Sequence, residues 1–269
     1  MVDYISFSSW KDWQTCPYKF KITRIDKVRL FAGNEYSTFG TAIHDTSEKI
    51  LILEDEQKKN GTSKDHSFDP ISFFKSSFKK ELESLPKEIK EKLSPDLINQ
   101  MKSQGEKLIP LILPALKEQF GDYELYSAEY ELRQPVNNKL NFDFYGFIDL
   151  ILKTPDGKFH IIDWKTCSWG WDLKKRTSKE YTYQLTYYKH FFAQQLKTDP
   201  KDIETYFALL KRTAKKDNVE IFRVTSGQKK MNNALNILDK CVTNIENKNF
   251  IKNRLSCGQC EFNKTIYCT

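Results

Sequence analysis

The sequence lacks the features that mark membrane and secreted proteins. Its most apolar stretch, Leu108–Leu116, is short and contains two prolines, far from the roughly 20 apolar residues that span a bilayer. No basic segment followed by an apolar one opens the chain, so we expect no secretory signal. Six cysteines in 269 residues are too few for a disulfide scaffold. We therefore expect a soluble, cytoplasmic protein with reduced thiols and no membrane partner.

A strong charge imbalance is also missing. The chain has 43 Lys and Arg against 36 Asp and Glu, which gives a net charge of +7. Its hydrophobic fraction of 39% excludes wholesale disorder, and its length allows one large domain. The basic excess gathers in residues 164–190, with six basic and two acidic residues, and in residues 209–230, with seven and two. This distribution permits a polyanionic partner such as DNA.

The first 120 residues predict helices. A short helix is expected to begin at Ser8-Ser9 and to end near Cys16-Pro17. Residues 55–69 are polar and turn-rich, so we expect a loop there. Further helices are expected at residues 38–54, 70–84, 86–93 and 96–118, the last bent by its two prolines.

The pattern changes at Gly121, after which apolar and polar residues alternate as in β-strands. Strands are expected at residues 124–135, 140–153, 158–166, 203–212 and 218–225. Helices are expected at residues 179–195 and from a cap at Ser226 to about 247. We predict one α/β (α+β) domain over residues 1–269: a mixed central sheet flanked by helices, an N-terminal helical elaboration with an insertion at 52–120, and a Cys-rich tail at 251–269.

Two carboxylates and a lysine lie on neighbouring predicted strands. Asp149 ends the segment Gly146-Phe147-Ile148-Asp149, and Asp163 and Lys165 flank a tryptophan on the next strand. Because side chains alternate along a strand, Asp163 and Lys165 point to the same face. Two carboxylates in an apolar sheet are costly unless a cation holds them, and a divalent metal with oxygen ligands would do so. The alternative is an ordinary ion pair between Asp163 and Lys165.

Three further polar residues support a functional interpretation, although each is a weak signal alone. His44 ends Phe39-Gly40-Thr41-Ala42-Ile43-His44 in an expected helix. Gln184 and Tyr188 are four residues apart in a later helix, so their amide and phenol share one face. Such an edge could bind a phosphate or the end of a nucleic-acid strand.

Together and in order, these residues resemble the RecB-like and Cas4-like (AddB-like) branch of the PD-(D/E)XK nuclease superfamily. The matching motifs are G-x-x-x-H ending at His44, G-x-I-D ending at Asp149, D-W-K-T beginning at Asp163, and Q-x-x-x-Y from Gln184 to Tyr188. The resemblance implies a restriction-endonuclease-like fold and a phosphodiesterase that depends on Mg²⁺ or Mn²⁺.

The resemblance also implies a role for each motif residue. The metal ligands would be His44, Asp149, Asp163 and the carbonyl of Trp164. Lys165 would position the attacking water, and Gln184 with Tyr188 would hold the DNA strand, so that Asp149, Asp163, Lys165, Gln184 and Tyr188 form the catalytic set. Glu129 or Glu131 on the preceding strand could support the site, and the sequence does not choose between them.

A basic cluster beside this site predicts a DNA contact. Lys174, Lys175 and Arg176 follow two tryptophans, Trp169 and Trp171. Cations among aromatic residues suit neutralisation of the backbone and base stacking on single strands. A solvated loop is the alternative.

The cysteines suggest a second metal site. Cys257 and Cys260 form a C-x2-C pair, which in a reduced compartment favours a metal, and Cys268 and Cys16 are further candidates. The resemblance implies that these four thiolates bind a [4Fe–4S] cluster. Zinc, which also accepts four sulfurs, is the alternative because the gap before Cys268 is longer than the family's usual spacing. The cluster would join the first helix to the tail.

These features predict a metal-dependent DNA exonuclease that acts on single-stranded DNA or DNA ends, with 5′→3′ polarity implied by the resemblance alone. One alternative is a non-catalytic DNA-end binding or adaptor module of the same fold. The other is a zinc-stabilised endonuclease. Partners of such a protein would be DNA and recombination, helicase or CRISPR-adaptation proteins.

Overall fold

Six strands form one mixed sheet in the computed structural model, which describes residues 3–60 and 68–269. The strands are β1 Tyr4–Ile5, β2 Glu124–Pro135, β3 Asp143–Lys153, β4 Phe159–Cys167, β5 Ile203–Lys211 and β6 Val219–Arg223. Their order is β1-β3-β4-β5-β6, and β2 also pairs with β3. The β1/β3 and β4/β5 pairs are parallel and the others antiparallel, which confirms the predicted mixed sheet flanked by helices.

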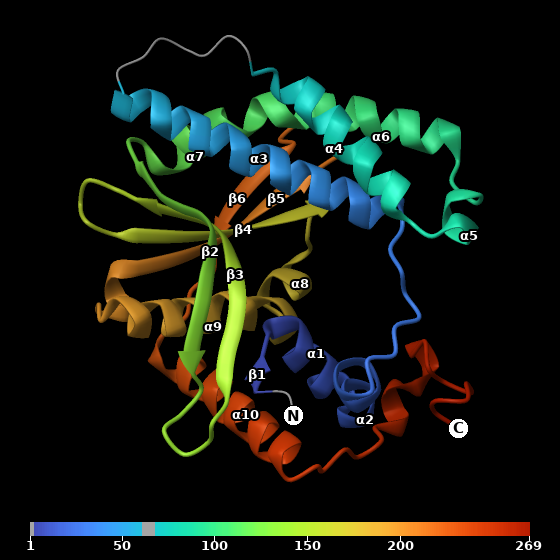
Figure 1. The fold of residues 1–269 in the computed structure, drawn as a ribbon. Coiled ribbons are helices and arrows are strands. Elements are labelled where there is room, and N and C mark those ends of the chain that lie inside the picture. The colour runs from blue at the N-terminus through green and yellow to red at the C-terminus, as the bar shows by residue number, and fades with distance from the viewer. Residues whose placement is uncertain (1–2, 61–67) are drawn as a thin grey trace.

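One helical layer covers the upper face of the sheet in Figure 1. It consists of α3 Glu35–Asn60, α4 Pro70–Ser84, α5 Lys87–Lys90, α6 Pro95–Leu108 and α7 Ile112–Phe120. Its core contains a cluster of three phenylalanines: Phe39 packs edge-on against Phe74 and Phe78, and all three are buried. Leu150 and Ile162 of the sheet belong to the same core. Residues 70–120 therefore add a helical layer to the sheet rather than a separate globule.

A second helical layer packs on the other face (Figure 1). It consists of α1 Phe7–Thr15, α2 Pro17–Phe20, α8 Leu173–Thr177, α9 Lys179–Leu196 and α10 Gln228–Glu246. Phe144 of β3 stacks on Phe191 of α9 with ring centroids 4.6 Å apart. Trp10 of α1 packs on Tyr187, whose hydroxyl donates to the Ala234 carbonyl of α10. The first helix is thus held in the core of the sheet domain.

The pairing of β3 explains where the sheet opens. A strand has two edges, and β2 pairs with β3 from Lys153 to Asp143 along one of them. On the other edge β4 pairs with residues 150–153 and β1 with residues 143–144. The β3/β4 register therefore ends at Leu150–Ile162, and Asp149 and Asp163 are the first residues beyond it. We call this divergence of β3 and β4 the fork.

Two expectations about helix ends are wrong. Residues 55–60 continue α3 rather than form a loop, because Glu54–Lys58 and Asp55–Lys59 ion pairs at i, i+4 spacing support the added turn. The rest of that expected loop includes residues 61–67, which lie outside the described residues. The last helix is capped by Gly227, not by Ser226, which is buried and hydrogen-bonded to Thr186 instead.

Other boundaries differ by a few residues. The second strand begins at Asp143 rather than at 140, and the expected helix at 96–118 divides at Pro110 into α6, a 3₁₀ turn Ile109–Leu111, and α7. Proline lacks the N–H that a continuous helix would need at that position. The helix expected at 86–93 is only the single turn of α5.

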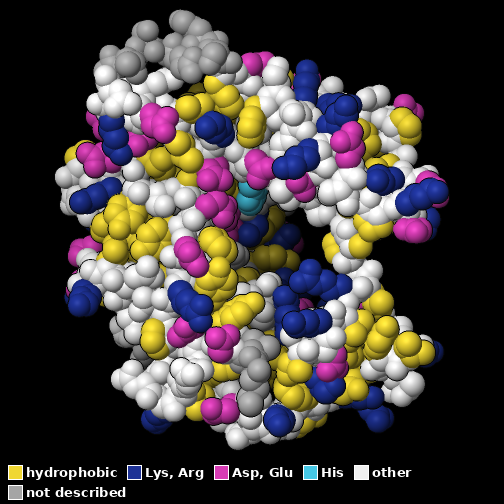
Figure 2. Space-filling model, in the orientation of Figure 1, with side chains coloured by type: hydrophobic (Ala, Val, Ile, Leu, Met, Phe, Trp, Pro, Cys, Tyr) yellow, Lys and Arg dark blue, Asp and Glu magenta, His cyan; other side chains and the backbone are white. Residues whose placement is uncertain are grey.

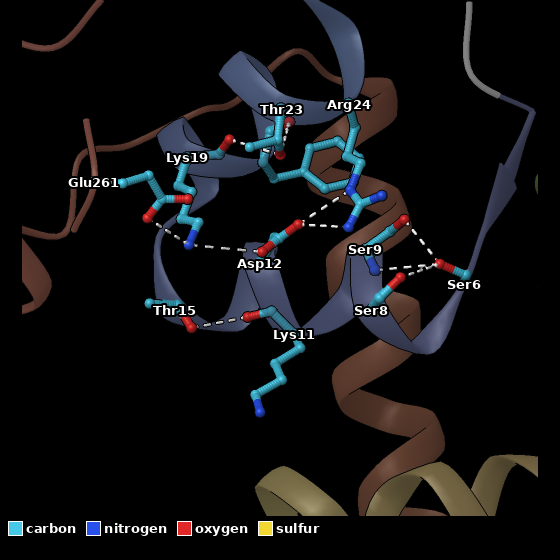
Figure 3. A network of polar contacts seen from close by, with 11 residues as sticks. Ser6, Ser8, Ser9, Lys11, Asp12, Thr15, Lys19, Thr23, Arg24 and Glu261 are labelled. Atoms are coloured by element: carbon cyan, nitrogen blue, oxygen red, sulfur yellow. Dashed lines mark hydrogen bonds and ion pairs between the residues drawn. The ribbon is translucent and has the colours of Figure 1, made fainter. Parts of the chain in front are cut away.

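The two ends of the chain are connected by polar contacts, which Figure 3 shows. Asp12 of α1 accepts from Nη2 and Nε of Arg24 at 2.7 and 3.0 Å. Lys19 of α2 lies 3.9 Å from Asp12 and 3.1 Å from Glu261 of the C-terminal tail. The Asn253 side chain also donates to the Thr15 carbonyl. These contacts place the tail beside the first two helices.

None of the helices among residues 3–60 and 68–269 combines the length and apolar character needed to cross a membrane.

Gly105 provides a test of the helical layer. A Cβ at Gly105 would lie 2.2 Å from the ring of Phe74, which is buried against Phe39 and Phe78 and cannot move aside. We expect Gly105→Ala to lower the free energy of unfolding by about 1–3 kcal/mol through overpacking, although alanine favours helices by ~1 kcal/mol relative to glycine. Urea denaturation measures the change. Ser103→Ala, at an exposed position of α6, is the control, and an equal or higher stability of Gly105→Ala would contradict the packing.

Candidate active site

The fork brings three elements together. His44 comes from α3, Asp149 from β3, and Asp163 with Lys165 from β4. The Trp164 backbone N–H donates to Asp149 Oδ2 at 2.8 Å, and His44 Nδ1 lies 3.8 Å from the same oxygen. The hydrogen bond from Trp164 to Asp149 links the two strands where their ladder has ended. The residues named for the metal site therefore lie around the fork.

Gly40 lets α3 approach the sheet closely enough to deliver His44. A Cβ at Gly40 would lie 3.2 Å from Thr166 Oγ1 of β4, closer than most side-chain contacts. Four residues later, one turn along α3, His44 lies beside the fork. The spacing of the G-x-x-x-H motif is thus explained by helix-to-strand packing.

Asp163 and Lys165 form an ion pair on one face of β4, as strand alternation predicts. The Asp163 side chain is fully buried, whereas 30% of the Lys165 side chain is exposed. Burial raises the pKa of Asp163 to about 6, although Lys165 opposes the shift. Burial also disfavours charge on Lys165, but Asp163 and Asp149 outweigh it and raise the lysine's pKa. The lysine is the cation that compensates two carboxylates at the fork.

His44 and Asp149 respond to the same environment. Burial, with a contribution from Lys165, lowers the pKa of His44 to about 4, so the imidazole is neutral at neutral pH. A neutral imidazole has a free lone pair and can bind a metal. Burial raises the pKa of Asp149, against the attraction of Lys165 and the Trp164 N–H. Both side chains suit a site that carries a further cation.

The structure distinguishes the two glutamates that the sequence could not. Glu129 has a backbone φ of +49° in β2, and its neighbours in the strand pair with Ile148 and Leu150 on either side of Asp149. Partial desolvation and the charge of Asp149 raise the pKa of Glu129 to about 7, although the residue is exposed at the surface. Glu131 instead is exposed and pairs with Phe147, and partial desolvation and the charge of Glu131 raise the pKa of Tyr145. Glu129 is therefore the glutamate that belongs to the site.

Two acidic residues of α3 also belong to this electrostatic group, and the sequence analysis missed them. Asp45 and Glu48 both raise the pKa of Glu129, and Asp45 accepts a hydrogen bond from Ser77 of α4 at 2.8 Å. Glu48 is one turn after His44, so the i, i+4 spacing was the available signal. With Asp149 and Asp163 they create a surplus of negative charge near the fork.

Trp164 contributes its backbone. Its side chain is buried in the core under α3, so only the N–H and carbonyl of this residue are available at the fork. The N–H is bonded to Asp149. A carbonyl in this position is one of the oxygen types that divalent cations accept.

Gln184 and Tyr188 of α9 form the other wall of the site. The Gln184 amide donates to the Tyr188 hydroxyl at 3.2 Å. Tyr188 is buried, and burial and the nearby Asp163 raise its pKa, so the phenol keeps its proton. Its ring lies against Gly146, where a Cβ would be only 3.4 Å away. The G-x-I-D and Q-x-x-x-Y motifs are therefore in direct contact.

A groove continues from this wall toward the N-terminal helices. We call it the N-terminal groove: a cavity of about 1100 Å³ that Gln184, Tyr188 and residues 145–147 line on one side and α1 and residues 23–29 on the other. Figure 2 shows a deep hollow on this face, with a histidine and acidic side chains at its upper edge and Lys and Arg along its lower edge. One wall of the groove is formed by residues 145–147 of β3, which lie between the residues that pair with β1 and those that pair with β4.

The predicted basic cluster lies outside this groove. Arg176 donates to Glu220 at 2.6 Å and to the Trp171 carbonyl at 2.7 Å. The Lys175 ammonium lies over the rings of Trp171 and Tyr181, 4.6 and 4.9 Å from their centroids, which is within the range of cation–π contacts. Lys174 is exposed. Arg176 and Lys175 therefore make contacts within the protein that hold α8 in place, and Lys174 is the exposed member of the cluster.

Two of the four predicted cluster cysteines meet at Asn253. Cys16 Sγ accepts from the Asn253 N–H at 3.3 Å, and Cys257 Sγ lies 3.9 Å from the Asn253 carbonyl. Cys260 and Cys268 are in the same tail, and Cys268 pairs with Thr265 in a short bridge. All six cysteines are free thiols. Of the two cysteines outside this set, Cys241 is buried in α10 and Cys167 is half-buried.

The donor set at the fork fits a hard divalent cation. Asp163 Oδ1 is buried without a hydrogen-bond partner, and several carboxylates share one lysine. No group of three or more His, Cys, Asp and Glu side chains among residues 3–60 and 68–269 is already arranged as a metal cage. At the fork, the Lys165 ammonium faces Asp163 instead. At the tail, the thiol chemistry fits a sulfur-bound metal, and the contacts bring Cys16 and Cys257 together.

One comparison with known proteins identifies a family, and another identifies a shared fold. A model of the PD-(D/E)XK nuclease superfamily matches residues 4–265. The chain also resembles the crystal structure of a candidate exonuclease from Eubacterium rectale, with 13% identity, a TM-score of 0.62, and coverage of 96% of this chain and 86% of that one. This likeness shows a shared fold.

Two other comparisons add no argument. The crystal structure of SSO0001 matches with 16% identity and a TM-score of 0.36, over 80% of this chain and 92% of that one. No curated protein matches the sequence.

The buried ion pair provides a test of the site's electrostatics. Lys165→Met keeps an unbranched side chain but removes the cation that faces Asp163. We expect the free energy of unfolding to fall by about 1–3 kcal/mol, below the 3–5 kcal/mol of a fully buried pair because the lysine is partly exposed. In an Asp163→Asn background the same change should cost about 1 kcal/mol less, because only the compensation of Asp149 is then lost, and a double-mutant cycle measures the difference. Equal losses in both backgrounds would show that the two residues are not coupled.

Proposed function

The chain belongs to the PD-(D/E)XK nuclease superfamily, and on that basis we propose that it is a metal-dependent DNA exonuclease. The observation that carries the proposal is the meeting of Asp149, Asp163 and Lys165 at the fork, with Trp164 N–H bonded to Asp149 at 2.8 Å. Membership supports nuclease chemistry. The exonuclease mode, the DNA substrate and the choice of metal are inferences from the motifs.

A Mg²⁺ or Mn²⁺ ion at the fork would be held by Asp149, Asp163, His44 and the Trp164 carbonyl. When bound, such an ion supplies Lewis-acid polarisation of a phosphoryl oxygen and a lowered pKa for water. The Oδ1 oxygen of Asp163 is buried without a hydrogen-bond partner among the described residues, and a bound cation would offset the cost of burying it. Glu129, Asp45 and Glu48 add negative charge around this position, and that charge favours the binding of a cation.

Lys165 and the α9 wall act on the substrate. Lys165 lies on the same face of β4 as Asp163 and 30% of its side chain is exposed, so its ammonium can orient a water and offset charge that develops on the phosphate. Tyr188 keeps its proton and can donate a hydrogen bond to a phosphate oxygen. Gln184 fixes the orientation of that hydroxyl. These positions suit a strand that passes between β4 and α9.

The tail supports the iron–sulfur assignment that the resemblance implies. Cys16 and Cys257 both contact the backbone of Asn253. Lys19 of α2 forms ion pairs with Asp12 of α1 and with Glu261 of the tail, so the tail is held beside these two helices. We propose that Cys16, Cys257, Cys260 and Cys268 bind a [4Fe–4S] cluster, with zinc as the alternative. Joining residues so far apart in the sequence removes much entropy from the unfolded chain.

Nuclease activity is tested by digestion of end-labelled single-stranded DNA with Mn²⁺ or Mg²⁺. We expect Lys165→Ala and Asp163→Ala to lower the rate by roughly 100-fold or more, because each removes a group that stabilises charge in the transition state. The matched controls are Lys158→Ala and Asp156→Asn, at the opposite end of the β3/β4 hairpin, and they should digest DNA like the parent.

Digestion by Lys165→Ala and Asp163→Ala at the parental rate would contradict the assignment. Tight binding of DNA ends by the parent without digestion under any divalent cation would indicate the non-catalytic module instead. Cleavage of covalently closed single-stranded circles would indicate an endonuclease.

The metal in the tail is tested by elemental analysis of anaerobically purified protein. We expect about four iron atoms per chain and a brown colour, both lost in Cys16→Ala and Cys257→Ala because a four-thiolate site does not tolerate the loss of a ligand. Cys167→Ala is the control, since Cys167 lies on β4 away from the tail. A colourless protein with one zinc per chain would contradict the iron–sulfur proposal.

A further inference from the structure

The N-terminal groove has an aromatic wall that the nuclease motifs do not explain. Tyr4 of β1 packs edge-on against Tyr145 of β3, with ring centroids 5.3 Å apart, and Tyr145 packs in the same way against Phe147 at 5.5 Å. All three line the groove. Tyr4 and Phe147 are 42% and 43% exposed, so their side chains are accessible to solvent.

The position of this wall follows from the sheet. Residues 145–147 are the stretch of β3 between the pairing with β1 and the pairing with β4, so neither neighbouring strand covers that edge. The alternation of β3 places Tyr145 and Phe147 on the same face, and Tyr4 extends the row from β1. The three rings therefore form one continuous surface.

The opposite wall carries positive charge. Arg24, Lys27 and Arg29 line the groove from the segment that follows α2. Asp12 holds the Arg24 guanidinium with two hydrogen bonds, as Figure 3 shows. Lys27 and Arg29 are exposed, and neither forms a salt bridge within residues 3–60 and 68–269. The hydroxyls of Ser6 and Ser8, which bond to each other at 2.9 Å, lie on the same side.

The groove is continuous with the candidate active site. Gln184 and Tyr188 belong to its lining, and the Tyr188 ring touches Gly146 between the two aromatic residues of β3. We propose that the N-terminal groove binds the unpaired segment of the substrate strand next to the fork. The bases lie against Tyr4, Tyr145 and Phe147, and the phosphates face Lys27 and Arg29. This inference rests on the proposed function and specifies its substrate as single-stranded DNA.

Exposed rings opposite free cations favour a single strand over a duplex. Bases stacked inside a duplex present no face to a protein ring, whereas unpaired bases stack on aromatic side chains without regard to sequence. A purely electrostatic site would need only the cations and would accept either form. The aromatic wall is thus the feature that gives the groove a preference.

The test measures binding separately from cleavage. Fluorescence anisotropy with EDTA present follows the full-length protein on an oligothymidylate strand of about 12 nucleotides, on an abasic strand of equal length, and on the corresponding duplex. We expect the parent to bind oligothymidylate most tightly. Tyr4→Ala and Phe147→Ala should each weaken that binding about fivefold or more and leave affinity for the abasic strand unchanged.

The cations predict a different pattern. Lys27→Ala and Arg29→Ala should weaken binding of the oligothymidylate and abasic strands alike, and each should lower the salt slope by about 0.7 per lost phosphate contact. Phe147→Tyr, which keeps a ring, should bind like the parent. Tyr36→Ala is the matched control, because Tyr36 is 45% exposed but lies outside the groove.

The inference is overturned if Tyr4→Ala and Phe147→Ala bind oligothymidylate as the parent does, if they lose affinity for the abasic strand equally, or if the parent prefers the duplex. These outcomes differ from a failure of the proposed function. Selective binding in the groove without digestion would refute the nuclease and leave the groove assignment standing. Digestion with unaltered binding by the groove variants would do the reverse.

Discussion

The structure depends on one local conflict: a fully buried aspartate at the point where two central strands separate. Asp163 follows the last register pair of β3 and β4, and its burial would be prohibitive without a partner. Lys165 supplies a counter-charge from the same face, and the Trp164 N–H binds the second carboxylate, Asp149. Beyond the last pair of the β3/β4 ladder, the Trp164 N–H thus donates to a side chain, Asp149, rather than to a backbone carbonyl of β3. A site whose acceptors exceed its donors in this way is suited to a cation.

The rest of the fold keeps that fork open and surrounds it. The two helical layers bury apolar residues on both faces of β3 and β4, so the strands cannot shift to restore pairing. Gly40 brings α3 close to β4, and Gly146 makes room for Tyr188 of α9. The contacts of Asp12, Lys19 and Glu261 hold α1, α2 and the tail together, and the start of α1 lines the groove that leads to the fork.

Much of this arrangement could be predicted from the sequence, and the reasons for the misses are physical. Strand alternation correctly placed Asp163 and Lys165 on one face, and the alternation of apolar and polar residues correctly marked β3 and β4. Position-by-position patterns cannot show that β1 and β4 share one edge of β3, so Tyr145 and Phe147 were not identified as groove residues. The choice between Glu129 and Glu131 could not be made because it depends on the left-handed backbone of Glu129 in β2, which the sequence does not reveal. The polar composition of residues 55–69 predicted a loop that begins too early, because i, i+4 ion pairs extend α3 to Asn60.

The central claim is that the fork is the cation-binding centre of a nuclease. The most direct measurement is the position of Mn²⁺, located by anomalous scattering in crystals of the full chain grown with that ion. The account predicts a peak within ligand distance of Asp149 and Asp163 carboxylate oxygens, with Lys165 displaced from its pairing with Asp163. A fork in which Lys165 stays paired with Asp163 at saturating Mn²⁺, with manganese bound elsewhere or not at all, would contradict it.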